Sequence, residues 1–82
     1  MYAADGNKVV FRHAGGEQND VAVCDQAEKA AKIMNRASYL NDAKRKYTAS
    51  ARLFAQAEQL PGFEWTPPEV EETSGLQAGQ PD

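Results

Sequence analysis

Alanine residues at helical spacing constrain the fold of this chain more than any other feature. One stripe recurs every three or four positions and consists of Ala27, Ala30, Ala31, Met34 and Ala37. This spacing places the five side chains on one face of an α-helix. Alanine lets another backbone approach closely but buries little apolar area. The sequence therefore predicts a helix that begins near residue 26 and packs closely around a thin core.

Two signals near this stripe predict how the helix starts and which way it faces. Asp25 followed by Glu28 matches a capping box, in which the first side chain accepts from early helix amides and the second reaches back. Lys29, Lys32 and Arg36 lie on the side opposite the stripe.

Asn41 and Asp42 leave two interpretations of residues 26–59. Either residue could cap a second helix and create a helical hairpin. Alternatively, one helix runs through, because neither Gly nor Pro interrupts it. Two helices are favoured, since an uncapped helix of more than about 25 residues is unusual outside coiled coils. The second segment has its own stripe of Ala43, Tyr47, Ala51, Phe54 and Ala57, and it ends at Leu60-Pro61-Gly62.

The N-terminal part is expected to form strands. The runs 8–12 and 21–24 are short and apolar, and a Gly15-Gly16 loop separates them. This arrangement predicts an antiparallel hairpin, and residues 2–4 could add a third strand through the Asp5-Gly6 turn. The predicted fold class is α+β, with an N-terminal β-hairpin packed on two alanine-rich helices or one long helix.

The predicted domain comprises residues 1–62, and residues 63–82 are expected to form a flexible, acidic, proline-containing tail. A domain of this size buries only about 60% of the surface of its unfolded chain. Cys24 and His13 are the only residues of their kinds, so no disulfide or Cys/His zinc site is expected within the chain. No cofactor is expected. A homodimer, through the alanine stripes or the hairpin edge, is one predicted source of extra burial.

Charge is strongly segregated although the net charge is only −3. Residues 29–52 hold seven Lys and Arg residues against one Asp, whereas the residues after them hold only acidic charges. The basic stretch has three interpretations: a solvated helix face, a protein-binding patch, or a nucleic-acid contact in which Tyr39 or Tyr47 stacks on bases. An acidic tail that folds back over the basic helices is a further alternative. The candidate partner-binding residues here are Arg36, Lys44, Arg45, Lys46 and Tyr47.

Phe63 and Trp65 precede the pair Pro67-Pro68 and complete the set of candidate partner-binding residues. In an extended chain their rings point to the same side, as in linear binding segments with aromatic anchors. The other interpretation is that both rings turn back and cover the thin core.

Catalysis is not expected. His13 has no second histidine or nearby carboxylate to orient it, and it is interpreted as a loop residue. Cys24 precedes a helix N-terminus that could activate it, but a buried, unreactive cysteine is the favoured interpretation. The N-terminus lacks the basic start and apolar run of a signal peptide, and no apolar run is long enough to span a membrane. A cytoplasmic location without membrane contact is expected.

The order of strand, Gly-rich loop, strand and capped helix, from Val9 to Glu28, resembles that of short phage-encoded accessory proteins. The resemblance implies binding and inhibition of a host protein, often a defence or transcription component, in the host cytoplasm. It assigns no site residues. The predicted function is that of a non-enzymatic protein-binding inhibitor or regulator. The alternatives are a nucleic-acid-binding accessory protein that uses the basic helices and a structural or assembly component of a virion.

Overall fold

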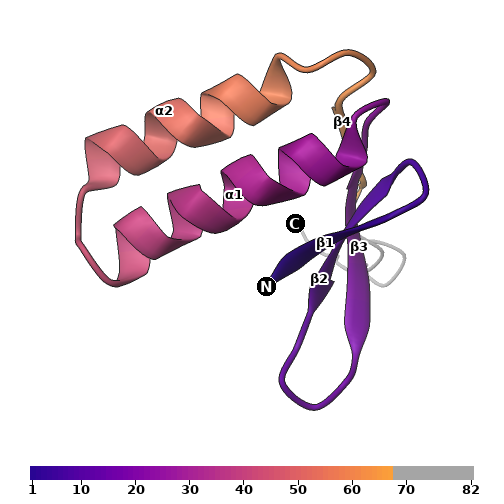
Figure 1. Ribbon diagram of the computed structural model, residues 1–82, viewed down its shortest axis with the longest axis horizontal. Coiled ribbons are helices and arrows are strands. Elements are labelled where there is room, and N and C mark those ends of the chain that lie inside the picture. The colour runs from indigo at the N-terminus through magenta and orange to yellow at the C-terminus, as the bar shows by residue number, and fades with distance from the viewer. Residues whose placement is uncertain (68–82) are drawn as a thin grey trace, which may run out of the picture.

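The computed structural model describes residues 1–67, which form an α+β fold with one sheet and two helices (Figure 1). The strands are β1 (Tyr2–Asp5), β2 (Lys8–Arg12), β3 (Gln18–Val23) and β4 (Glu64–Trp65), and the helices are α1 (Ala27–Asp42) and α2 (Tyr47–Glu58). The sheet is antiparallel with the order β1-β2-β3-β4. The predicted class, the third N-terminal strand and the division into two helices are confirmed.

The turn between β1 and β2 is formed by Gly6 and Asn7, because Asp5 pairs with Lys8. Gly6 has a φ of 64°, which is the conformation that a two-residue hairpin with glycine in its first position requires. The predicted Asp5-Gly6 turn therefore does join the first two strands.

The pairing of β2 with β3 contains a bulge. Val9 pairs with Ala22 and Val10 pairs with Asp20, so Val21 has no partner of its own in the register. The strand also starts at Gln18, three residues earlier than the apolar run indicates. The side chains at 18–20 are polar and exposed, so hydrophobicity does not mark them, although their backbone still pairs with β2.

The stripe on α1 forms the centre of the core, as predicted. Its five residues are buried, and four of them cluster with Val9, Ala22, Cys24 and Ala57. This face is therefore covered within the monomer and is not available for the dimer contact that the alanine stripe suggested.

The predicted capping box at the start of α1 is wrong. The helix begins at Ala27 with Gln26 as its N-cap, and no side chain caps it. Asp25 lies outside the helix, where its backbone N–H donates to the Pro61 carbonyl at 3.0 Å. A contact from the far end of the chain thus determines the position of Asp25, and a local capping pattern cannot reveal that contact.

The break between the helices lies later than Asn41 and Asp42, so the expectation that either residue caps α2 is wrong. Both residues belong to the last turn of α1, and the N-cap of α2 is Lys46. The chain reverses at Arg45, which has a φ of 55°. The buried positions of α2 are Ser50 and Ala57, whereas three members of the expected stripe are exposed: Ala43, Tyr47 and Ala51.

The chain returns to the sheet after α2. Trp65 pairs with Ala22, Glu64 pairs with Val23, and the Thr66 N–H donates to the Val21 carbonyl at 2.9 Å. The chain therefore continues to pair with the sheet beyond Gly62, where the tail was expected to start. The remainder of the expected acidic tail, residues 68–82, lies outside the described residues. Within residues 1–67, neither helix is long and apolar enough to cross a membrane.

Candidate partner-binding surface

Three exposed side chains form a compact cluster where α1 ends. The Arg36 guanidinium carbon lies 5.6 Å from the centre of the Tyr39 ring, and the Lys44 Nζ lies 5.9 Å from the same point. Tyr39 is 45% exposed. Each contact is a cation–π interaction, which contributes about 0.5–1 kcal/mol at exposed sites. Two positive charges therefore lie beside one exposed ring on the protein surface.

The turn that follows adds two more cations and a second tyrosine. Arg45, Lys46 and Tyr47 are all exposed, and Tyr47 is 59% exposed. The turn is fixed by hydrogen bonds from Lys44 N–H to the Tyr39 carbonyl and from Lys46 N–H to the Leu40 carbonyl. We refer to the exposed residues around this turn as the tip surface, which comprises Arg36, Tyr39, Lys44, Arg45, Lys46 and Tyr47.

The tip surface belongs to a part of the molecule that extends away from the sheet. Figure 1 shows α1 and α2 side by side, with the turn between them at the end far from the strands. Inside this end, the helices meet through small residues: the Ser50 hydroxyl donates to the Ala37 carbonyl at 2.7 Å. The close contact fixes the two helices against each other, so the tip surface has a defined shape.

Phe63 and Trp65 do not belong to the tip surface. The Trp65 Nε1–H donates to Glu58 Oε2 at 2.7 Å, at the other end of α2, roughly 17 Å along the helix from Tyr47. The two rings meet edge to face with centroids 5.0 Å apart, and Phe63 packs on the core. Phe63 therefore covers the core, whereas Trp65 packs on Phe63 and Glu58 and stays 45% exposed. The structure thus separates the seven predicted binding residues into five at the tip and two beside the sheet.

From the sequence, Tyr39 is expected only as a ring that stacks on bases, and its contact with two cations is not predicted. The sequence does indicate the contact between Arg36 and Tyr39, because these residues are three positions apart and so lie on one helix face. Lys44 lies beyond the end of α1, where its backbone N–H donates to the Tyr39 carbonyl at 3.4 Å, and no helical spacing rule reveals its approach to the ring.

Neither catalytic candidate gains a catalytic environment. His13 is exposed and its Nε2 contacts Asn19 Oδ1 across the hairpin. Cys24 is buried, and its thiol donates to the Pro61 carbonyl at 3.5 Å. Among residues 1–67, no three His, Cys, Asp or Glu side chains gather as a metal site would require.

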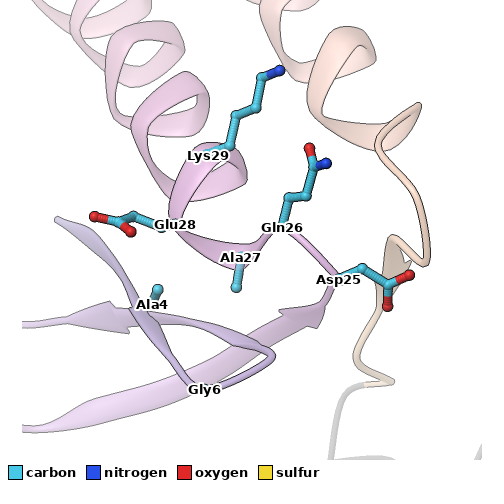
Figure 2. A pocket seen from close by; sticks show the side chains of 7 residues that line it. All are labelled: Ala4, Gly6, Asp25, Gln26, Ala27, Glu28 and Lys29. Carbon is cyan, nitrogen blue, oxygen red and sulfur yellow. The ribbon is translucent and has the colours of Figure 1, made fainter.

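A shallow hollow of about 630 Å³ lies beside the start of α1. Its polar lining residues are Asp25, Gln26, Glu28 and Lys29. Figure 2 shows that these side chains point in different directions rather than toward a common centre. A binding or catalytic site needs converging polar groups, so the hollow is a weaker candidate than the tip surface.

No protein-family model matches this chain, and neither a curated protein nor a solved structure shows significant similarity to it.

Proposed function

We propose that this protein is a non-enzymatic inhibitor or regulator that binds a partner protein through its tip surface. The observation that carries the proposal is the cluster in which Arg36 and Lys44 lie over the ring of Tyr39. Among the described residues, the one ion pair joins Lys8 to Asp20, so the cations of this cluster are not neutralised there.

The composition of the tip surface supports a protein interface. Tyrosine and arginine are enriched where proteins meet and are frequent among the residues that dominate binding. Two half-exposed tyrosines beside four cations therefore combine apolar contact area with charge. Because the Tyr39 ring already restrains two of these side chains, less of their conformational entropy is lost on binding.

The position of the tip surface supports a mechanism of occlusion. The paired helices extend from the sheet and end in this surface, so it can enter a recess on a partner without a clash from the strands (Figure 1). The resemblance to phage-encoded accessory proteins makes a host protein the proposed partner, and the host cytoplasm the proposed location.

Nucleic acid is the competing ligand, because the tip carries four of the nine Lys and Arg residues of the chain. Single-stranded nucleic acids bind by stacking bases on open aromatic faces. Arg36 and Lys44 already lie over the Tyr39 ring, which leaves less of it for a base. A protein partner therefore fits the geometry better.

Site-specific crosslinking tests the proposal. A benzophenone amino acid replaces Tyr47 in the full-length chain, and a matched variant carries it at Val23, an exposed position on β3. Both are incubated with nuclease-treated host lysate and irradiated. We expect one stoichiometric protein adduct from position 47 and none from position 23. The adduct should disappear when Lys44, Arg45 and Lys46 are all replaced by Glu. Equal crosslinking from both positions, or recovery of nucleic acid alone without nuclease, contradicts the proposal.

A further inference from the structure

The solvent-facing side of α1 carries a row of cations that continues the tip surface toward the sheet. Lys29, Lys32 and Arg36 are separated by three and four residues, so they lie on one side of the helix. All three are exposed, while Ala30 and Met34 on the opposite side are fully buried. We refer to this row, together with Tyr39 and Lys44, as the α1 face.

The α1 face has a defined length. Between Lys29 and Asn41 the helix contains no acidic residue, whereas Glu28 and Asp42 are exposed at its two ends. The helix from Glu28 to Asp42 is about 20 Å long at 1.5 Å per residue. A fully extended peptide covers this length with about six residues. The flanking carboxylates repel a longer polyanion.

Two like charges lie over one ring at the end of this row. Arg36 and Lys44 are both within 6 Å of the centre of the Tyr39 ring, so their charges repel each other while the ring attracts each of them. A carboxylate that binds beside the ring is attracted by both charges and accepts a hydrogen bond from the cation that it meets. The cluster is therefore arranged to receive an anion.

We infer that the α1 face binds an acidic peptide segment of about six residues in a partner protein, with one carboxylate held at the end of the face where Arg36 and Lys44 lie. This inference rests on the proposed function and specifies the chemistry of the partner. The remaining acidic side chains of the segment lie along Lys32 and Lys29. Tyr39 is a positioning residue that holds the two cations in place.

Fluorescence anisotropy with a labelled hexaglutamate peptide tests the inference, with hexaglutamine as the uncharged reference. In the full-length protein, Arg36→Gln with Lys44→Gln removes two charges from the α1 face. Lys8→Gln with Arg12→Gln removes two charges from β2 and serves as the matched control. At a low ionic strength of about 0.02 M, we expect about a fivefold or greater loss of hexaglutamate affinity for the first pair and less than twofold for the control.

Two further variants examine the ring itself. Tyr39→Phe keeps an aromatic face beneath both cations, so affinity should stay within about twofold of the unsubstituted protein. Tyr39→Leu removes the face and should weaken hexaglutamate binding about threefold, although the helix remains folded by circular dichroism.

Several outcomes would overturn the inference. These are no hexaglutamate binding at low salt, equal losses in the two double variants, and no difference between the Tyr39 variants. Tighter binding of a single-stranded oligonucleotide than of hexaglutamate would assign the α1 face to nucleic acid instead. If hexaglutamate fails but the adduct from position 47 persists, the proposed function stands and only the acidic partner is rejected. If hexaglutamate binds as expected while position 47 gives no adduct, the α1 face binds acidic peptides but the proposed function is rejected.

Discussion

The side-chain amide of Asn35 on α1 bonds to both backbone polar groups of Tyr2 on β1. Asn35 Oδ1 accepts from the Tyr2 N–H at 2.7 Å, and Asn35 Nδ2 donates to the Tyr2 carbonyl at 2.8 Å. The neighbouring Met1 pairs with Arg12 through both of its backbone groups, so those of Tyr2 face away from β2. A helix side chain thus covers part of the edge of the sheet, which would otherwise be open to pairing with another chain.

Replacing Asn35 should destabilise the fold by removing this edge contact. Asn35→Leu leaves two part-buried backbone groups without their partner, and we expect a loss of about 1–3 kcal/mol in the free energy of unfolding. Asn35→Asp keeps the acceptor for the Tyr2 N–H and should lose less. Asn41→Leu, an exposed position on the same helix, is the control and should change stability by less than about 0.5 kcal/mol. Urea denaturation provides the measurement, and equal values for positions 35 and 41 would contradict the prediction.

Ser50 lies at a buried contact between the two helices, and it should tolerate no larger side chain. It is 2% exposed and bonded to the Ala37 carbonyl. Ser50→Leu inserts three extra carbon atoms into this contact and should cost about 1–3 kcal/mol or more. Ala51→Leu places the same side chain one position further on the exposed side of α2 and should be nearly neutral. The melting temperatures of the two variants provide the test, and Ser50→Leu should have the lower value. If Ala51 were buried, as the stripe predicted from the sequence implies, Ala51→Leu would have the lower value instead.

Gly62 lies against Asp25. A comparison of Gly62 with Gly6 separates the effect of this contact from that of backbone strain. Gly62 has a φ of 73°, and a Cβ added there would lie 2.5 Å from Asp25 Oδ1. Gly6 has a similar φ of 64° but open space around it. Both alanine variants should lose about 1 kcal/mol from strain, and Gly62→Ala should lose more. Adding Asp25→Ala to Gly62→Ala should remove the excess. Equal losses at the two glycines would mean that the Asp25 side chain moves aside without cost.

Trp65 should contribute to stability more than to binding. Its indole N–H donates to Glu58 Oε2, and its ring meets that of Phe63 edge to face. We expect Trp65→Ala to reduce the free energy of unfolding by about 1–2 kcal/mol. Tyr47→Ala, which removes a more exposed ring, should leave stability within about 0.5 kcal/mol. In the crosslinking assay with the probe placed at Lys46, Tyr47→Ala should weaken formation of the protein adduct, whereas Trp65→Ala should leave it largely unchanged. A Trp65→Ala variant that stays fully stable yet loses its partner would restore the tryptophan as a binding anchor.

Much of the fold could be predicted from local sequence patterns because it depends on residues close together in the chain. The buried face of α1 follows from the helical period of its alanines, and the β1–β2 hairpin follows from one glycine turn. The end of α2 follows from Pro61 and Gly62, since proline cannot continue a helix. For the candidate site, the cations could be identified as a basic stretch and Tyr47 as a candidate binding residue. The exposure of Tyr47, which lies in the expected apolar stripe, and the contact of Tyr39 with two cations could not.

Local sequence patterns therefore specify the three N-terminal strands, the helical character of most of residues 26–59, the α1 stripe that forms the core and the concentration of positive charge on residues 29–52. Long-range contacts decide how these elements are held together and that residues 64–65 add a fourth strand to the sheet. The Pro61 carbonyl positions Asp25 outside the helix, Asn35 covers the strand edge, and Trp65 returns to Glu58. The physical reason is that periodicity reports the direction of a side chain relative to its own element. The partner that the side chain meets depends on how distant segments pack.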